Sequence, residues 1–301
     1  MEGRASLMPQ VEANGLTFEY ERQGSGEPLL LIMGLGAQLT AWPVELVDGL
    51  AGRGFDVIRY DNRDIGLSSV CDWEPPSQLR AFFAKLFRRP IETGYVIDDM
   101  ADDAAGVLDA LGIESAHIVG VSMGGMISQA LAIRHPHRVR SLTSIMSNPG
   151  DGSGSLTPKI ALKFARRPEP TLENAVDQAV ETYGAISGPH FDETVYRPLA
   201  EAAVARSFRP EGLARQTAAI MASADRVPGL RRVKVPTLVV HGLLDPLVKP
   251  SGGIRTAEVV PDSRLLMFND MAHDLPAPRI PEILDAIASV AARAGSDAVV
   301  A

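Results

Sequence analysis

The chain alternates short apolar runs with longer segments in which apolar residues recur at helical spacing. Residues 28–33 are continuously apolar, as is typical of a strand buried on both faces. In the segment 98–111, Met100, Val107 and Leu108 lie on one side of a helix. Strands that alternate with helices predict an α/β fold, with a mostly parallel sheet covered by helices on both faces. We expect strands at 28–33, 55–60, 116–119, 139–146, 235–241 and 264–268, helices at 42–51, 98–111, 125–134 and 281–292, and a tight hairpin at Asn14-Gly15.

One interval interrupts this alternation. Residues 148–155 are rich in Gly, Ser, Asn and Pro, which favour turns. From residue 158 to about 228 the pattern is helical, and alternation resumes at 235. The sequence therefore predicts a core in two parts, 1–150 and 231–301, with a helical cap or lid, 151–230, inserted between two strands of the sheet.

The composition of the chain limits the classes of protein to which it can belong. The chain has 301 residues, of which 46% are hydrophobic and 22% charged, as in a soluble globular protein. A net charge of −8 argues against nucleic acid as a partner, because phosphate binding needs a basic surface. The single cysteine, Cys71, excludes an internal disulfide and suits a reducing compartment. With no apolar run typical of an export signal or a membrane span, we expect a cytoplasmic protein.

A glycine–serine pentapeptide stands where the run 116–119 ends and a helical pattern begins. It reads Gly-Val-Ser-Met-Gly, with Ser122 at its centre. Between a buried strand and a helix, such a string places the serine on a sharp, strained turn, with its hydroxyl projecting away from both elements. Side chains at Gly120 and Gly124 would collide with the neighbouring elements. Ser122 is therefore the candidate nucleophile.

A serine hydroxyl needs a base to take its proton, and histidine is the usual base near neutral pH. Among the six histidines, His273 follows the last predicted strand, at the carboxyl edge of the sheet, where open α/β sheets place their chemistry. We predict that His273 is this base. We assign the other five to the core, the turns or the cap: His117, His135, His137, His190 and His241.

The base in turn needs a carboxylate to fix its tautomer and stabilise its charged form. Asp245 follows the last predicted strand but one, and it gives the chain order Ser122, Asp245, His273, which is the order expected for this strand–turn–helix motif. We predict Asp245 for this role. Asp151, which follows an earlier strand, is the alternative.

The negative oxygen that forms during acyl transfer needs two backbone N–H donors. We expect one from Met123, directly after the nucleophile, and the other from Leu35, in the loop after the strand 28–33. Gly34 and Gly36 let the chain turn closely on either side of Leu35. No cluster of residues has metal-ligand spacing and no phosphate-binding loop is present, so we expect no cofactor.

These segments together resemble the α/β-hydrolase fold superfamily over nearly the whole chain. Within it, the chain is similar to the aclacinomycin methylesterase-like esterases and the related actinobacterial lipase/esterases. Many members carry a histidine before the oxyanion glycine, whereas this chain has Met33, a feature that the methylesterase-like branch shares. The resemblance is carried by residues 31–36, 42–43, 58–68 and 120–125 and by the stretches that end at Asp245 and His273.

The resemblance implies a serine hydrolase that cleaves carboxylic esters, of the lipase or carboxylesterase type, through an acyl-enzyme intermediate. A thioesterase, a phospholipase or a carbon–carbon bond hydrolase would use the same triad, and a haloperoxidase-like side reaction is a further alternative. A dehalogenase or an epoxide hydrolase would need an aspartate in place of Ser122. From a different class, a non-catalytic binding protein on this scaffold stays open. A loop that recurs in such hydrolases, with Asp61, Arg63, Gly66 and Ser68, is expected to be held near the site by an Asp61–Arg63 pair.

Two further patterns concern the substrate, a small-molecule or lipid ester. Apolar residues of the cap either line an acyl pocket or pack the cap itself: Ile160, Leu162, Phe164, Tyr183, Ile186, Phe191 and Leu199. In the segment 79–89, apolar and basic residues alternate at helical spacing. The segment is then either an ordinary helix with a solvated basic face or a peripheral contact with an anionic membrane, which would favour lipid metabolism.

Overall fold

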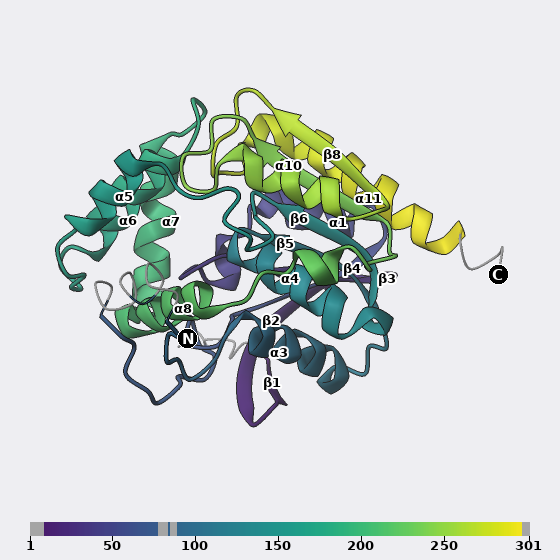
Figure 1. Ribbon diagram of the computed structural model, residues 1–301, viewed down its shortest axis with the longest axis horizontal. Helices are drawn as coiled ribbons and strands as arrows, with labels where there is room; N and C mark the ends of the chain where they lie inside the picture. The colour runs from purple at the N-terminus through teal and green to yellow at the C-terminus, as the bar shows by residue number, and fades with distance from the viewer. Residues whose placement is uncertain (1–8, 78–83, 85–88, 297–301) are drawn as a thin grey trace, which may run out of the picture.

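An eight-stranded sheet crosses the middle of the molecule, with helices on both of its faces (Figure 1). The computed structural model of the protein describes residues 9–77, 84 and 89–296. The strand order in the sheet is β1-β2-β4-β3-β5-β6-β7-β8. The strands are β1 Gln10–Ala13, β2 Leu16–Gly24, β3 Glu27–Ile32, β4 Phe55–Tyr60, β5 Ala116–Val121, β6 Val139–Ile145, β7 Thr237–Gly242 and β8 Ser263–Phe268.

The strands from β3 to β8 all run parallel to one another, whereas β2 pairs in antiparallel fashion with both of its neighbours, β1 and β4. The predicted hairpin at Asn14-Gly15 joins β1 to β2. Because parallel strands all end at the same edge, the loops that follow β3, β5, β7 and β8 meet there. The prediction of a mostly parallel α/β sheet is confirmed.

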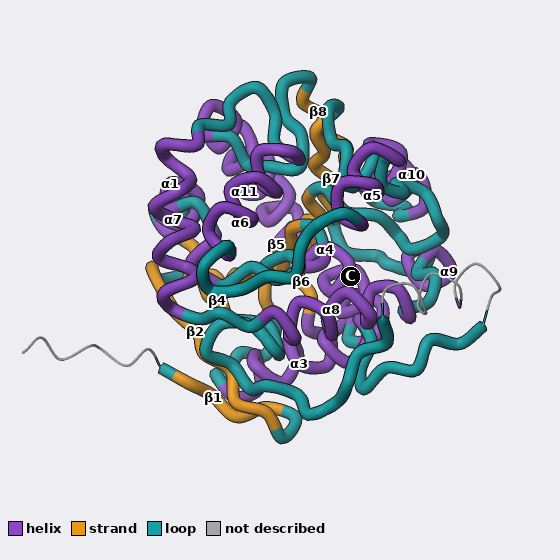
Figure 2. The backbone as a smooth tube through the Cα atoms, turned by 90° about the vertical axis from the view of Figure 1, so that its left-hand side faces the viewer, coloured by secondary structure: helices purple, strands orange, loops and turns teal. Residues whose placement is uncertain are grey.

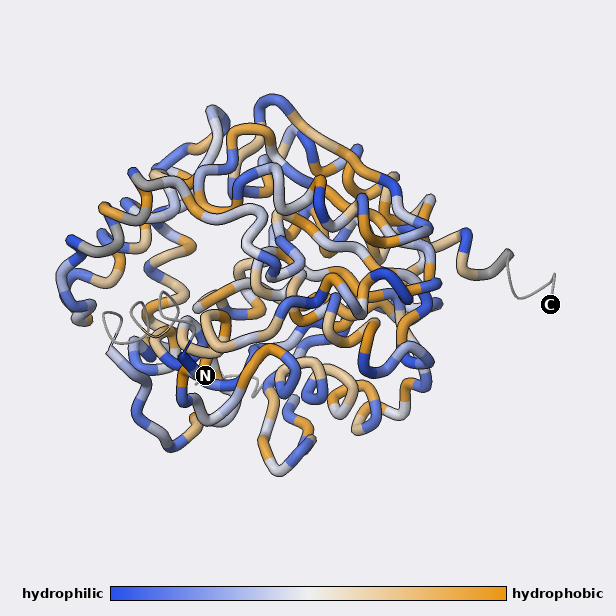
Figure 3. The backbone as a smooth tube through the Cα atoms, viewed as in Figure 1, coloured by the Kyte–Doolittle hydropathy of each residue, from blue (hydrophilic) through white to orange (hydrophobic). Residues whose placement is uncertain are grey.

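Two hydrophobic cores lie on the two faces of the sheet. One joins the central strands to α3, α4, α9 and α10, and the other joins them to α1 and α11. Helices at the surface carry hydrophobic and hydrophilic residues in alternation (Figure 3), which is the pattern of a helix that packs one side and exposes the other. The helices of these two layers are α1 Val44–Ala51, α3 Ile97–Ala110, α4 Met123–Arg134, α9 Val227–Leu230, α10 Pro250–Val259 and α11 Ile280–Ser296.

Prolines explain where two elements begin later than the sequence suggests. The helix predicted at 42–51 begins at Val44 as α1, with Pro43 as its N-cap, and a short 3-10 turn, Leu39–Ala41, precedes it. Proline lacks the N–H that a continuous helix would need and is favoured at a helix start. The strand predicted at 235–241 is β7, which starts after Pro236 for the same reason.

Four helices make up most of the segment between β6 and β7 and form a separate layer. They are α5 Pro158–Ala165, α6 Ala175–Ile186, α7 Glu193–Arg206 and α8 Pro210–Ala222. Figures 1 and 2 show this helical insert on one side of the sheet, with α6 and α7 side by side and α8 lying next to α3. An insert of helices between two strands agrees with the predicted architecture.

Candidate active site

Ser122 occupies a sharp turn between β5 and α4. Its backbone angles are φ 56° and ψ −119°, a strained conformation for a residue that is not glycine. The two flanking glycines permit the turn: a Cβ on Gly120 would lie 2.1 Å from the Gly124 oxygen, and one on Gly124 would lie 1.9 Å from the Ile32 oxygen. Both glycines are therefore required by close packing, as the sequence predicted, and the turn directs the Ser122 side chain away from the sheet.

A pair of hydrogen bonds links the three predicted triad residues. The Ser122 hydroxyl lies 2.9 Å from Nε2 of His273, and Nδ1 of His273 lies 2.7 Å from Oδ2 of Asp245. The Nδ1–H group donates to the carboxylate, which leaves Nε2 free to accept the serine proton. His273 is 8% exposed, Asp245 is 3% exposed, and Ser122 is half-buried. The fold thus brings together three groups that are far apart in the sequence.

Asp245 is held on its other side by the backbone of its own loop. Its Oδ1 accepts hydrogen bonds from the amides of Leu247 and Val248, at 2.9 and 2.8 Å. Burial raises the pKa of Asp245, but the charge of His273, the close approach of His241 and the hydrogen bond from His273 outweigh it, so that the net pKa lies below its ordinary value. Asp245 is therefore ionised when it faces the imidazole.

His241, at the end of β7, lies close to the Asp245 carboxylate. Its Nε2 donates a 2.7 Å hydrogen bond to the carbonyl of Val248 and lies 3.4 Å from Oδ2 of Asp245. The residue is completely buried. Its hydrogen bond to Val248 ties the end of β7 to the loop that carries Asp245.

The alternative aspartate lies elsewhere. Asp151 is exposed, bonds the amide and hydroxyl of Ser153, and pairs with Arg255. His190, in the helical insert, pairs with Asp270, which Arg279 also binds. Of the two candidates that the sequence offered, the structure therefore places Asp245 beside His273.

The loop after β3, residues 34–36, lies against the nucleophile, and we call it the oxyanion loop. A Cβ added to Gly34 would be 3.1 Å from Cβ of Ser122 and 3.7 Å from its Oγ. In the described part of the chain, the Leu35 amide has no hydrogen-bond acceptor. Met123 provides the first N–H of α4, which has no acceptor within the helix and lies at the positive end of the helix dipole. Neither amide therefore has an acceptor among the described residues, and each belongs to a segment that adjoins Ser122.

The loop at 61–68 is built differently from the prediction. Asp61 and Arg63 do not pair with each other: Arg63 binds the buried Asp103 of α3 at 2.6 Å, and Asp61 binds Arg206 of α7 at 2.8 Å. Asp61 also accepts hydrogen bonds from the amides of Leu39 and Leu67. These three donors bind the Asp61 carboxylate, and the Arg63 side chain points toward α3 instead. The loop is still held in place, but through the neighbouring helices.

Several residues that hold the site were not found from the sequence. Asn62 donates to the carbonyl of Met33, directly before the oxyanion loop, and Gln216 of α8 accepts from the amide of Gly36. Asn62 stands inside a stretch that carries the family resemblance, so a signal existed for it. Gln216 is one polar residue in a helical pattern, and nothing local marks it.

The apolar residues of the insert divide between its interior and its surface. Ile160 and Ile186 are buried, whereas Leu162 and Leu199 are more than half exposed. Tyr183 stacks on Tyr196 with ring centroids 4.1 Å apart, and Phe191 packs edge-on against Tyr183. These aromatic residues pack the insert itself. The side chain of Phe164 lies outside the described residues.

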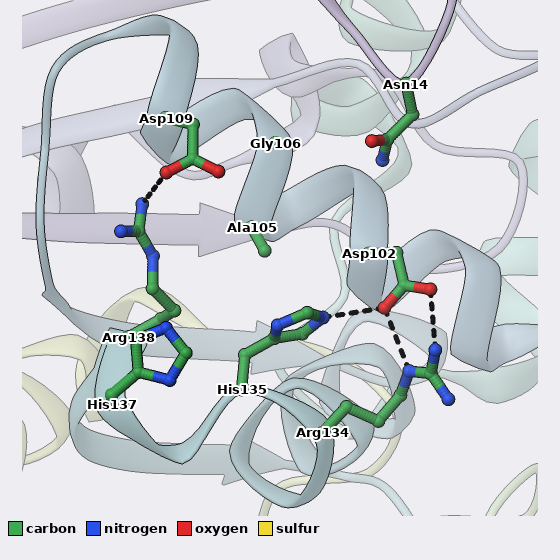
Figure 4. Close-up of a pocket in the computed structure, with 9 residues that line it drawn as sticks. All are labelled: Asn14, Asp102, Ala105, Gly106, Asp109, Arg134, His135, His137 and Arg138. Atoms are coloured by element: carbon green, nitrogen blue, oxygen red, sulfur yellow. Dashed lines mark hydrogen bonds and ion pairs between the residues drawn. The ribbon is translucent and has the colours of Figure 1, made fainter.

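A surface pocket is found at the opposite end of α4 from Ser122 (Figure 4). Since α4 has 12 residues, this end lies about 18 Å from the elbow. Arg134 and His135 both bind Asp102 there, and Arg138 binds Asp109, so the charges in this pocket are compensated. The pocket is therefore separate from the triad.

Two expectations concern membranes and metals. The segment 79–89 lies outside the described residues except for Ala84 and Arg89, so its predicted amphipathic helix stays a prediction. Among the residues that the structure describes, no helix has the length and apolar character to cross a membrane. In the same ranges, no group of three or more His, Cys, Asp or Glu side chains is arranged to hold a metal ion.

Comparison with known proteins identifies relatives that are hydrolases. Residues 27–277 match the family model described as alpha/beta hydrolase fold. The chain is 30% identical to rhodomycin D methylesterase of Streptomyces peucetius, over 83% of this chain and 85% of that protein. It is also 30% identical to 2-hydroxymuconate semialdehyde hydrolase of Pseudomonas sp. (strain CF600), over 88% of this chain and 86% of that protein. The enol-lactonase of Burkholderia xenovorans LB400 has a similar fold, with a TM-score of 0.71 at 23% identity, over 94% of this chain and 99% of that one.

Proposed function

The chain belongs to the alpha/beta hydrolase fold family, and on this premise we propose that it is a serine hydrolase that cleaves carboxylic esters through an acyl-enzyme intermediate. The observation that carries the proposal is the continuous hydrogen-bonded path from Asp245 through His273 to Ser122, with distances of 2.7 and 2.9 Å. The similarity to a methylesterase favours an ester as the bond that is cleaved.

In the first half of the reaction, Ser122 attacks the ester carbonyl while Nε2 of His273 takes its proton. Asp245 stabilises the imidazolium that forms and keeps the ring in the tautomer that the attack requires. The tetrahedral intermediate then collapses, and His273 gives its proton to the departing alcohol oxygen. The acyl group stays on the Ser122 oxygen.

In the second half, a water molecule takes the place of the alcohol. His273 removes a proton from this water, which attacks the acyl carbonyl, and the acid leaves as Ser122 recovers its proton. In both halves a negative charge develops on the carbonyl oxygen. We assign its stabilisation to the backbone amides of Leu35 and Met123, because both lie beside the nucleophile with an unused donor.

The helical insert supplies the cap over this site. We infer that residues 151–230 act as this cap and that the two parts of the core, 1–150 and 231–301, carry the catalytic groups. Two contacts support this assignment: the amide of His273 donates to the carbonyl of Ile186 at 2.9 Å, and Gln216 bonds the oxyanion loop. The cap therefore borders the triad from the histidine side and from the oxyanion side.

Labelling with a fluorophosphonate probe tests the proposed nucleophile. We expect the wild-type chain to be labelled covalently and the Ser122→Ala variant to be unlabelled. A matched control is Ser128→Ala, because Ser128 lies about 1.7 turns beyond Ser122 and its hydroxyl bonds only the Gly124 carbonyl in the described residues. An unlabelled wild-type chain would contradict the proposal and favour a binding protein on this scaffold.

A substrate series tests the proposed bond type. Nitrophenyl esters of increasing acyl length are compared with matched acyl thioesters and a phospholipid under the same conditions. We expect kcat/KM to be highest for the oxygen esters. A preference for the thioesters or for the phospholipid would replace esterase by thioesterase or phospholipase.

The second candidate function is hydrolysis of a carbon–carbon bond. It is favoured by the 30% identity to 2-hydroxymuconate semialdehyde hydrolase. The same serine, histidine and carboxylate would serve in it, so the triad does not separate the two reactions. Turnover of 2-hydroxymuconate semialdehyde, followed by loss of its absorbance, distinguishes them: turnover faster than that of every ester would make this the primary activity.

A further inference from the structure

The position of the oxyanion loop decides how well the site stabilises the transition state. Hydrogen-bond donors act in catalysis only if they are fixed where the negative oxygen will form. The loop, residues 34–36, follows β3 and contains two glycines, so its peptide planes have little intrinsic restraint. Restraint must therefore come from neighbouring groups.

Three hydrogen bonds restrain the three successive peptide planes of this loop. Asn62 donates to the carbonyl of Met33 at 3.0 Å, which fixes the plane before Gly34. The amide of Ala37 donates to the carbonyl of Gly34 at 3.3 Å, which restrains the plane that carries the Leu35 amide. Oε1 of Gln216 accepts from the amide of Gly36 at 2.9 Å, which fixes the plane after Leu35.

Gln216 is the one contributor among these three that comes from the helical insert. It is completely buried, and its Nε2 donates to the carbonyl of Arg63 at 2.8 Å. The two bonds determine how its side-chain amide is oriented, since the oxygen faces an N–H and the nitrogen faces a carbonyl. Gln216 thus ties the oxyanion loop to the loop at 61–68.

Helix α8, which carries Gln216, is anchored firmly to the core. Arg215 pairs with the buried Asp64 at 3.0 Å, and Arg206, just before α8, pairs with the buried Asp61. At the start of α8, a Cβ added to Gly212 would lie 2.2 Å from the carbonyl oxygen of Asp64. This end of the insert is fixed to the core at three points.

Helix α8 also shapes the loop by packing. Gly36 has φ +70°, and a Cβ there would lie 2.7 Å from Cδ1 of Leu213. Leu213 and Gln216 are three positions apart in α8, so they face the same side of the helix and meet Gly36 together. The left-handed turn of the oxyanion loop is therefore formed against α8.

From these contacts we propose that Gln216 is a positioning residue that sets the oxyanion loop, so that the helical insert controls transition-state stabilisation as well as access to the site. The inference rests on the proposed function, because it concerns the same triad. According to this proposal the insert has two parts. Helix α8 belongs to the catalytic structure, and the outer helices α5, α6 and α7 border the substrate.

The test compares Gln216→Met with Gln38→Met, both nearly equal in volume to the original residue. Gln38 is also buried and also links core to insert, through the carbonyls of Ala203 and Ser207, but it does not bond the oxyanion loop. Both variants are assayed with nitrophenyl acetate, which has the shortest acyl chain of the nitrophenyl ester series. Thermal unfolding of both variants shows whether each remains folded.

For Gln216→Met we expect kcat to fall about 10- to 100-fold, because a displaced donor loses its effect on the transition state. KM should stay within about twofold, because the ground state does not use the oxyanion donors. Affinity for an aryl boronic acid, which forms a tetrahedral adduct on the serine, should fall in parallel with kcat. Gln38→Met should keep kcat and boronate affinity within about twofold of wild type.

Two results would overturn the inference. One is a folded Gln216→Met variant with wild-type kcat and boronate affinity. The other is an equal loss in Gln38→Met, which would mean that docking of the insert, and not Gln216, sets the rate. A wild-type chain that hydrolyses no ester would instead overturn the proposed function, and this outcome is visible before either variant is made.

Discussion

Asp245 and His273 lie 28 positions apart in the sequence, and their side chains meet in a 2.7 Å hydrogen bond at the carboxyl edge of the sheet. The bond joins the loop after β7 to the loop after β8, two neighbouring parallel strands. Its geometry places the histidine proton on Nδ1 and turns Nε2 toward Ser122. The orientation of the base is therefore set by one carboxylate.

The first prediction concerns this carboxylate. Asp245→Asn should lower kcat by about four orders of magnitude, because an amide favours the wrong tautomer and does not stabilise the imidazolium. Asp151→Asn is the matched control and should keep kcat within about twofold, because Asp151 is an exposed partner of Arg255. Nitrophenyl ester kinetics measure both. Near-normal turnover in Asp245→Asn would remove this residue from the triad.

The second prediction concerns the buried pair Arg215–Asp64, which anchors α8. Arg215→Met leaves the completely buried Asp64 carboxylate without its cation, and the free energy of unfolding should fall by about 3–5 kcal/mol. Arg197→Met removes two exposed ion pairs, with Asp177 and Glu193, and should lower the free energy of unfolding much less, because solvent screens exposed charges. Urea unfolding measures both. Equal losses in the two variants would contradict the argument from burial.

The third prediction concerns pH and His117, which is buried in β5 between Ser141 and Glu27. Burial lowers the pKa of His117, and the hydrogen bond to Glu27 only partly offsets this. The unfolded chain then binds the proton more tightly than the folded chain, so stability should decrease as the pH falls below about 6.5.

Urea midpoints at about pH 7.5 and about pH 5.5 measure this loss. In His117→Gln the difference between the two midpoints should shrink. His137→Gln changes an exposed histidine and should leave the difference as in wild type. An unchanged difference in His117→Gln would assign the acid sensitivity to other groups.

The fourth prediction concerns the elbow. Gly124→Ala would bring a methyl group to 1.9 Å from the carbonyl oxygen of Ile32, so the strand and helix would have to separate. We expect a loss of about 3 kcal/mol or more, or failure to fold. Gly52→Ala is the control, since its Cβ would meet nothing closer than 3.2 Å and its backbone is helical. Thermal unfolding measures both, and equal stability of the two variants would refute the packing argument.

The sequence by itself determined the strands, the helices and the chemical groups of the site. An apolar run next to a glycine–serine turn identifies β5 and Ser122, because strand burial and backbone strain leave local marks. The order of strands also placed Asp245 and His273 at one edge, because parallel strands share their carboxyl ends. These inferences need only the residues near each position.

The tertiary structure alone decided which polar side chains meet between the layers. The Asp61–Arg63 pair expected from the resemblance is absent, since Arg63 binds Asp103 and Asp61 binds Arg206. Gln216 reaches Gly36 across 180 positions of sequence. Such contacts depend on how α3, α7 and α8 are oriented against the loops, and packing of whole helices sets that orientation. A hydrogen bond between distant segments produces no periodic pattern in either segment, so the sequence alone does not predict it.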